Sequence, residues 1–269
     1  MKELLKKYYR RFFKKAWQNK IKPFINTKLY FVKKKQCYIC NKKFHHFSKH
    51  VNIRPKEFGK IIQMVGTDPK NFKCYYCGCN DRIRHLFMFF DKLSLWSKFE
   101  NARILHFAPE KEISNKIKSL KPANYIMADL FPKNEECRKI DLTDIPFDDN
   151  SMDIILCNHV LEHVVDYKKA LSEIKRVLSK NGFAILQTPY SLLLNKNFED
   201  DSIDNEYLRT YFYKQYDHVR IFSKKQLFQD IEAAGLELNI VKNTEIFDDN
   251  ETYYYGVNKL EDLIKVIKK

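Results

Sequence analysis

Two cysteine pairs in this 269-residue chain have the type and spacing of metal ligands. Cys37 and Cys40 form one C-x-x-C pair, and Cys74 and Cys77 form a second after a spacer of 33 residues. Each tight turn can point two thiolates at one centre, and four thiolates are common ligands of structural zinc. Gly78 follows the second pair, where such a turn needs a residue that tolerates positive φ. We therefore predict a structural zinc site here. Spare ligands nearby are Cys79, His45, His46 and His50.

A second group of residues predicts proton transfer or metal binding. His159, Glu162 and His163 stand at i, i+3 and i+4, a spacing that would put them on one face of a helix. His218 follows further along the chain. The candidate catalytic residues are His159, His163 and His218, with His163 or His218 as general base for a substrate hydroxyl because imidazole titrates near neutral pH.

The same side chains have two other interpretations. Together, His159, Glu162, His163 and His218 would hold a divalent metal that lowers the pKa of a bound hydroxyl. A histidine as the first ligand favours zinc, manganese or iron over magnesium. Alternatively, the Leu161-Glu162-His163 run only caps and packs the start of a helix.

Short apolar runs alternate with amphipathic stretches from about residue 100, which predicts an α/β fold with a mostly parallel, doubly wound sheet. The expected strands are 103–108, 125–128, 138–140, 152–158, 183–188 and 236–241, with an antiparallel strand over 252–257. The expected helices are 111–120, 166–179 and 223–234, the last closed by Gly235. Asp129 and Asp141 end the second and third strands, where an open parallel sheet forms its ligand-binding crevice.

The run from Asp141 to Pro189 contains I-P-F-D-D-N-S-M-D-I-I-L, then L-E-H, then A-L-S-E-I-K-R-V-L-S-K-N-G. This string resembles the class I S-adenosylmethionine (SAM)-dependent methyltransferases of the type 11 sort, and the resemblance covers roughly residues 101–245. It implies a Rossmann-like fold and SAM as cofactor.

The resemblance also implies cofactor-binding residues. Asp129 matches the acid that accepts hydrogen bonds from both ribose hydroxyls. Asp141 and Leu142 match the turn at the adenine, while Asn158 and His159 match the end of the fourth strand, beside the methyl group. The further cofactor candidates are His106, Ala108, Glu110 and Leu130.

The first loop departs from the family pattern. It reads H-F-A-P-E over residues 106–110 where the family has glycines. Ala108 replaces the first glycine, Pro109 removes an N–H donor, and Glu110 stands at the second glycine. Either the Glu110 carboxylate pairs with the ammonium group of the cofactor, or cofactor binding is lost; the acids at 129 and 141 favour binding.

The whole chain is similar to a methyltransferase subgroup with this H-x-A-P-E loop and an N-terminal cysteine module, associated with cell-surface glycan genes. Its C-G-x-x-D-R-x-R-H run at Cys77–His85 and its D-H-V-R run at Asp217–Arg220 take part in that similarity. The metal interpretation of the histidine group is similar to the E-x-x-E-H…H site of terminal-ribose RNA 2′-O-methyltransferases and of ubiquinone-pathway O-methyltransferases.

Charge is concentrated at the N-terminal end. The formal net charge is +15, and residues 1–35 hold 13 lysines and arginines against one acid. Over residues 2–22, aromatic and aliphatic side chains would occupy one face of a helix and basic ones the other. Such a helix suits an anionic membrane surface through residues 1–25, a nucleic-acid backbone, or packing on its own protein.

We predict three segments: a basic amphipathic helix over 1–35, a zinc-binding module over 36–90, and a methyltransferase domain over 91–269. Within the last, about residues 190–216 form an insertion too long for a simple connection, which predicts a lid or acceptor site or, alternatively, a solvated helix. The longest apolar runs are too short for a membrane span, and the N-terminus lacks the apolar core of a signal peptide. Seven cysteines in this pattern indicate a reducing compartment, so we expect a cytoplasmic protein. If the basic helix is the membrane-binding one of its three interpretations, the protein lies at the inner face of the membrane.

The predicted function is that of a SAM-dependent O-methyltransferase acting on a hydroxyl of a cell-surface glycan or its lipid- or nucleotide-linked precursor. One alternative is an RNA methyltransferase whose basic zinc module binds RNA. Another is a non-catalytic scaffold with a methyltransferase fold, suggested by the altered first loop. The oligomeric state stays open.

Overall fold

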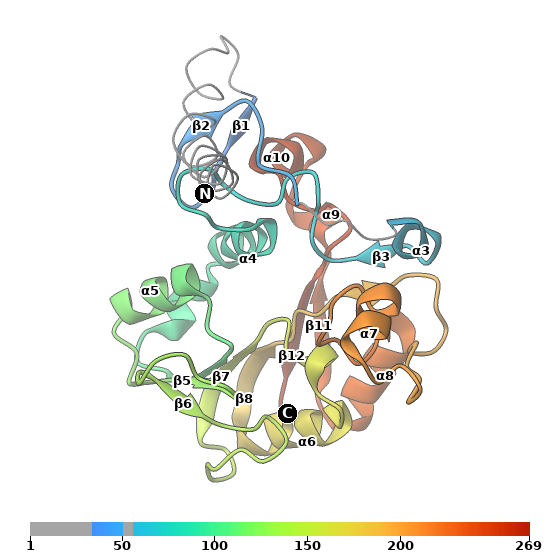
Figure 1. The fold of residues 1–269 in the computed structure, drawn as a ribbon. Helices are drawn as coiled ribbons and strands as arrows, with labels where there is room; N and C mark the ends of the chain where they lie inside the picture. Colours follow the sequence, from blue (N-terminus) through green and yellow to red (C-terminus); the bar gives the residue numbers. More distant parts are fainter. Residues whose placement is uncertain (1–33, 51–55) are drawn as a thin grey trace, which may run out of the picture. The chain divides into compact units, whose positions relative to one another are not determined.

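The computed structural model describes residues 34–50 and 56–269 (Figure 1). The helix predicted over 2–22 lies outside these residues, so its membrane, nucleic-acid and internal-packing interpretations stay predictions. The described chain forms two compact units. One contains residues 34–50, 67–87 and 247–258, and the other contains residues 56–66, 88–246 and 259–269.

The first unit combines segments from both ends of the described chain. It holds the antiparallel pair β1 (Lys35–Gln36) and β2 (Lys43–Phe44), the start of α4 (Asp81–Lys92), and α10 (Asp249–Tyr255). The strand predicted over 252–257 is therefore wrong. Asp248 and Glu251 form a capping box that begins α10, and Gly256, at φ 62°, ends it. These local signals outweigh the strand preference of the Thr-Tyr-Tyr-Tyr run.

The second unit is built on a seven-stranded sheet with the order β11-β12-β8-β7-β4-β5-β6. Five strands are parallel: β4 (Arg103–Phe107), β5 (Asn124–Asp129), β6 (Cys137–Lys139), β7 (Met152–Cys157) and β8 (Leu178–Ile185). β12 (Leu263–Ile267) runs antiparallel to both β8 and β11 (Glu237–Val241). This mostly parallel sheet confirms the predicted Rossmann-like fold class, although the sequence analysis did not predict β12.

Three amphipathic helices accompany the sheet: α5 (Lys111–Ser119), α6 (Tyr167–Val177) and α8 (Lys224–Ala233). α6 buries Tyr167, Ala170, Leu171, Ile174 and Val177, the spacing of one helix face, and contacts β8 and α8. In Figure 1 it runs along the lower side of the sheet. The predicted end of α8 is confirmed, because Gly235 follows it at φ 82°.

Shorter elements complete this unit. They are α3 (Lys56–Ile61), β3 (Met64–Val65), η2 (Leu95–Phe99), η3 (Leu161–His163), β9 (Tyr190–Ser191), α7 (Glu206–Phe212), β10 (Phe222–Ser223) and α9 (Asn243–Ile246). β10, β9 and β3 form a small separate sheet. The predicted insertion runs from β9 through α7. Within residues 34–50 and 56–269, no helix is both long enough and apolar enough to cross a bilayer.

Candidate active site and cysteine cluster

The four predicted zinc ligands lie together in the first unit. One sulfur from each of Cys37, Cys40, Cys74 and Cys77 lies within 4.8 Å of the others. The Cys37–Cys77 and Cys40–Cys74 sulfur distances are both 3.7 Å. Thiolates at about 2.3 Å from a tetrahedral zinc ion are about 3.8 Å apart, so this donor set fits zinc.

Two further features support the turn that carries the second pair. Gly78 has a φ of 79°, which confirms the expected left-handed residue. The Cys79 sulfur lies 3.4 Å from that of Cys37, so a fifth thiol contacts the cluster. The buried Arg84 guanidinium donates to the carbonyl oxygens of Cys79 and Gly256, which joins the turn to the 247–258 segment.

A cavity of about 750 Å³ lies in the second unit at the carboxyl ends of the parallel strands. Asp129 and Asp141 line it after β5 and β6. Oδ1 of Asp129 accepts from the Phe131 N–H at 2.8 Å, and Oδ1 of Asp141 accepts from the Thr143 N–H at 2.8 Å. These local turns fix the two carboxylates and leave Oδ2 of each for a ligand.

Six of the nine predicted cofactor residues line this cavity: Ala108, Asp129, Leu130, Asp141, Leu142 and His159. Asn158, at the end of β7, does not line it. Its side-chain amide is buried, and neither polar atom has a hydrogen-bond partner among the described residues. Because an unpaired buried amide is costly, this position fits a site completed by a ligand.

The other two predicted cofactor residues, His106 and Glu110, bind each other. His106 is fully buried; Nε2 lies 2.8 Å from Oε2 of Glu110, and Nδ1 lies 2.9 Å from the Tyr125 hydroxyl. Burial by itself raises the pKa of Glu110, but the hydrogen bond and charge of His106 outweigh it and lower the pKa. The Glu110 carboxylate is therefore ionised near neutral pH, and His106 of β4 holds it in place.

The altered first loop keeps the conformation of a glycine. Ala108 has a φ of 46°, in the left-handed region, and its N–H donates to the Ala128 carbonyl at 2.8 Å. Left-handed backbone at a non-glycine residue costs about 1–3 kcal/mol and persists where the surroundings impose it. The loop at the cavity thus has the shape that glycine usually provides.

Replacing Ala108 with glycine should therefore stabilise the fold. Removing the Cβ relieves the left-handed strain, and the extra freedom of glycine in the unfolded chain offsets part of the gain, so we expect about 1 kcal/mol. Urea unfolding of Ala108→Gly measures this change. The control is Ala123→Gly, at an exposed residue whose φ is negative, and its free energy of unfolding should stay the same or fall. Equal changes in the two variants would show that the backbone at Ala108 is not strained.

Glu162 lies at the centre of the histidine group. Its side chain is 1% exposed, and Oε2 accepts from the Thr188 hydroxyl at 2.8 Å. Nδ1 of His159 lies 3.3 Å from Oε1 of Glu162. The rings of His163 and His218 meet edge to face at 4.7 Å, and one ligand atom from each of Glu162, His163 and His218 lies within 4.8 Å of the others.

A shared helix face does not assemble these residues, so that expectation is wrong. Only Leu161–His163 forms a 3-10 turn, and His159 precedes it at a φ of 54°. The left-handed backbone and a 2.6 Å hydrogen bond from the His159 N–H to the Gln187 carbonyl bring that imidazole beside Glu162.

The electrostatics of this group follow from burial and proximity. Burial alone raises the pKa of Glu162, but hydrogen bonding to His159 and the charges of His159, His218 and His163 bring it to about 2. Burial lowers the pKa of His218 to about 4, although the charge of Glu162 opposes this change. Near neutral pH the site therefore holds a buried carboxylate beside a neutral His218, whose Nδ1 has no hydrogen-bond partner among the described residues.

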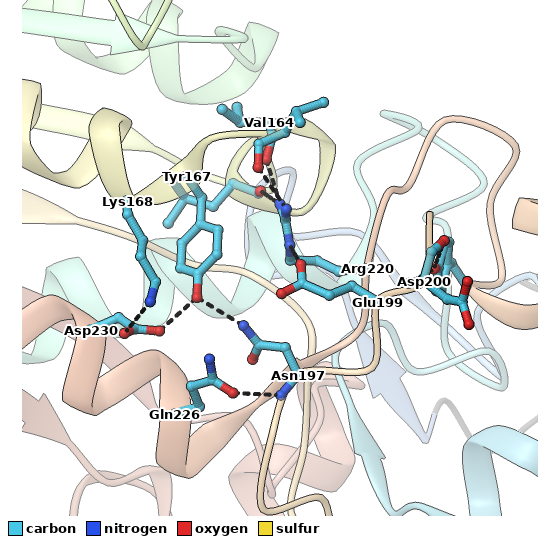
Figure 2. Close-up of polar contacts among 12 residues, drawn as sticks. Val164, Tyr167, Lys168, Asn197, Glu199, Asp200, Arg220, Gln226 and Asp230 are labelled. Carbon is cyan, nitrogen blue, oxygen red and sulfur yellow. Dashed lines mark hydrogen bonds and ion pairs between the residues drawn. The ribbon is translucent and has the colours of Figure 1, made fainter. Parts of the chain in front are cut away.

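Arg220 holds the backbone that carries this turn, as Figure 2 shows. Its side chain is 5% exposed and donates to the carbonyl oxygens of Val164 and Val165 and, through Nε at 2.6 Å, to Glu199. Its guanidinium also stacks 4.6 Å from the centre of the Tyr167 ring. One buried cation therefore connects the insertion, through Glu199, to the loop after Glu162.

A second network fixes the insertion to the helices (Figure 2). The Tyr167 hydroxyl donates to Asp230 at 2.6 Å and accepts from the Asn197 side chain at 2.9 Å. The Asn197 N–H donates to Oε1 of Gln226 at 2.8 Å. The insertion is thus bonded to α6 and α8 near its start.

Replacing Arg220 with lysine should lower the free energy of unfolding by about 1–2 kcal/mol. An ammonium keeps the charge beside Glu199 but loses the planar fork that reaches two carbonyls. Chemical denaturation checks this value. The control is Arg138→Lys, at an exposed residue of β6. A similar drop in its free energy of unfolding would contradict the role of the Arg220 hydrogen bonds in holding the turn.

The sequence analysis missed four residues of the site. Arg209, Asp217 and Val219 line the cavity, and Thr188 is the hydroxyl bonded to Glu162. Asp217 precedes the predicted His218 in the D-H-V-R run, which the resemblance assigns to the acceptor wall, but Asp217 itself was not predicted as a site residue. Arg209 lies in the predicted insertion, where arginine among tyrosines was the available signal.

Part of the chain matches a known family model. Residues 112–186, less than a third of the chain, match the family model described as "Methyltransferase domain". An uncharacterized protein of Methanocaldococcus jannaschii is 35% identical over 94 residues, 35% of this chain and 34% of the relative. The uncharacterized methyltransferase YcgJ of Bacillus subtilis is 32% identical over 104 residues, 35% of this chain and 39% of the relative. The chain thus spans little more than a third of these relatives.

Solved structures are also similar to this chain. The crystal structure of YcgJ from Bacillus subtilis has a TM-score of 0.46 and 17% identity, covering 69% of this chain and 99% of that one. A SAM-dependent methyltransferase from Mesorhizobium loti has a TM-score of 0.47 and 10% identity, covering 66% of this chain and 96% of that one.

Proposed function

We propose that this protein is a SAM-dependent methyltransferase that methylates a hydroxyl oxygen. One observation carries the proposal: a single cavity has Asp129 and Asp141 on one side, and His159 and His163 of the Glu162 group on the other. The first pair suits the cofactor, and the second group suits an acceptor that must lose a proton. The methyltransferase-domain match over 112–186 supports the same class.

The chain's own residues would hold the cofactor as follows. Oδ2 of Asp129 accepts from the ribose hydroxyls, and the Asp141–Leu142 turn contacts the adenine. The unpaired Asn158 amide and His159 lie at the end of β7, where the reacting group belongs. The cofactor supplies an electrophilic methyl group on a sulfonium.

His159 is the proposed proton acceptor. The acceptor oxygen forms a bond to the methyl carbon while the carbon–sulfur bond breaks, and that electron pair stays on sulfur. The hydroxyl proton passes to His159, and the buried Glu162 carboxylate 3.3 Å away stabilises the imidazolium. The cavity walls orient the two reactants, which is the larger part of catalysis for such a displacement.

A divalent metal at Glu162, His163 and His218 is the second candidate for activating the hydroxyl. The observation that favours it is the convergence of one carboxylate and two imidazoles within 4.8 Å. Such a donor set suits iron, manganese or zinc, and coordination lowers the pKa of a bound hydroxyl.

Titration with manganese distinguishes the two mechanisms. If the three residues hold a metal, wild-type protein that carries one equivalent of zinc, at its cysteines, binds Mn²⁺ at the second group, and His218→Ala weakens that binding at least tenfold because one of three ligands is lost. Electron paramagnetic resonance of free Mn²⁺ measures the Mn²⁺ affinity of the wild-type protein and of His218→Ala, with His46→Ala as the control variant. Wild-type protein that leaves all Mn²⁺ free removes the metal candidate and leaves proton transfer to His159.

We also propose structural zinc at the four clustered cysteines. For the molecule that carries the hydroxyl, we propose a cell-surface glycan or its precursor, which rests on the sequence resemblance. The first experiment is calorimetric titration of SAM into the zinc-loaded protein. Micromolar binding supports the methyltransferase; no binding at millimolar SAM by intact protein would instead support the non-catalytic scaffold.

A further inference from the structure

Arg209 stands apart among the arginines of the second unit. It is half-buried and lines the cavity, and among the described residues its guanidinium makes one hydrogen bond, from Nε to the Ile203 carbonyl at 3.4 Å. Arg103, Arg176 and Arg220 each form an ion pair. Arg138 forms none among the described residues, but it is exposed on β6 and does not line the cavity. Over the described ranges no carboxylate oxygen lies within ion-pair distance of Arg209.

This isolation is not due to a lack of nearby acids. The insertion carries five of them within eight residues: Glu199, Asp200, Asp201, Asp204 and Glu206. Glu199 pairs with Arg220, Asp200 accepts from Ser202, and Asp204 accepts from Asn205. The fold thus keeps the Arg209 guanidinium apart from its acidic neighbours and at the cavity wall.

The helix that carries Arg209 is held in place. Tyr213, which follows α7, is fully buried, and its ring packs 5.7 Å from that of Phe198. Its hydroxyl accepts from the Asp200 N–H at 2.9 Å, and its own N–H donates to the Arg209 carbonyl at 2.7 Å. The position of the cation at the cavity is therefore set by core packing.

We propose that Arg209 binds an oxyanion, a carboxylate or phosphoryl group, on the methyl acceptor. A guanidinium offers a planar fork of N–H donors that matches both groups. Partial burial without a counter-charge is costly, and a bound anion would remove that cost. The inference rests on the proposed methyltransferase function and adds to it that the acceptor is negatively charged.

Strand order places Arg209 on the acceptor side. Asp129 and Asp141 follow β5 and β6, on one side of β4 in the sheet. β7, which ends before His159, lies on the other side of β4, and the Val219 N–H donates to the Glu162 carbonyl at 3.0 Å. In Figure 1, α7, which carries Arg209, lies on the side of β11, away from β5 and β6. The cation therefore lies with the histidine group, away from the acids assigned to the ribose and adenine.

A matched series of small ligands tests the proposal: glycerol, glycerate and glycerol 3-phosphate share hydroxyls and differ in charge. Ligand-observed NMR would measure their binding to protein saturated with S-adenosylhomocysteine at constant ionic strength. We expect at least one anion to bind at least tenfold more tightly than glycerol, and Arg209→Gln to abolish the difference. The preferred anion tells carboxylate from phosphoryl.

Three outcomes would overturn the inference. They are equal or undetectable binding of all three ligands to wild-type protein, an unchanged anion preference in Arg209→Gln, and loss of that preference in the control Arg138→Gln. Cofactor affinity adds a separate check. If Arg209→Gln weakens S-adenosylhomocysteine tenfold but not methylthioadenosine, which lacks the amino-acid carboxylate, Arg209 serves the cofactor and the inference fails. Wild-type protein that binds neither nucleoside would overturn the proposed function itself.

Discussion

Replacing Asp129 with alanine should weaken SAM binding at least 100-fold. The carboxylate ends β5 at the cavity, and its Oδ1 is fixed by the Phe131 N–H, so Oδ2 faces a ligand without reorganisation. Hydrogen bonds to a charged group contribute about 1.5–3 kcal/mol each, and losing two corresponds to about 100-fold or more. Calorimetric titration of SAM measures this change.

Two companion variants make this result specific. Asp129→Asn keeps an oxygen for the Phe131 N–H but places an NH2 group where Oδ2 stood. This group can donate to a ribose hydroxyl oxygen but cannot accept, so a smaller loss of about tenfold is expected. Asp144→Ala removes an exposed carboxylate that does not line the cavity and should bind SAM like wild type. If Asp129→Ala binds SAM normally, the ribose role is wrong.

Removing the proposed zinc should unfold the first unit while the second stays folded. The buried cluster around the cysteines is Cys37, Phe44, Phe47, Cys74 and Cys79, three of whose five members are thiols. So small an apolar core cannot offset the chain entropy alone. Structural zinc contributes about 10–16 kcal/mol in zinc-finger peptides, and that free energy would be lost.

Hydrogen exchange with and without a chelator tests this prediction. Peptides from 34–50, 67–87 and 247–258 should lose protection together, while peptides from β4, β7 and β8 keep it. Cys40→Ser should reproduce the effect of the chelator, and Cys137→Ser, in β6 away from the cluster, should not. Retained protection of 247–258 after complete metal removal would refute the dependence.

Much of the sheet could be predicted because its signals are local. β4, β5 and β7 are short apolar runs with helical periodicity between them, and their observed bounds lie within a residue or two of the predicted ones. Asp129 and Asp141 followed from their position at strand ends. The cysteine cluster was predictable for the same reason, since C-x-x-C spacing encodes its own turn.

The false strand over 252–257 came from overlooking the local capping signals of α10, whereas the other errors arose where distant parts of the chain decide the structure. β12 is only five residues long, and its place between β8 and β11 depends on pairing with both. Glu162 meets His218 through a 3-10 turn and a segment 56 residues later, so a helical spacing could not predict that contact. The isolation of Arg209 from acids next to it in sequence is likewise visible only in three dimensions.

The position of residues 247–258 has a consequence for synthesis on the ribosome. The chain leaves the sheet after β11, contributes α10 to the cysteine-containing unit, and returns to place β12 inside the sheet between β8 and β11. Neither unit can therefore finish folding as its first residues emerge from the ribosome, since the first unit needs 247–258 and the second needs β12, which are made after the rest of each unit. The usual vectorial order, N-terminal domain first, is not available to this protein, and the exposed edge of β8 must wait for β12.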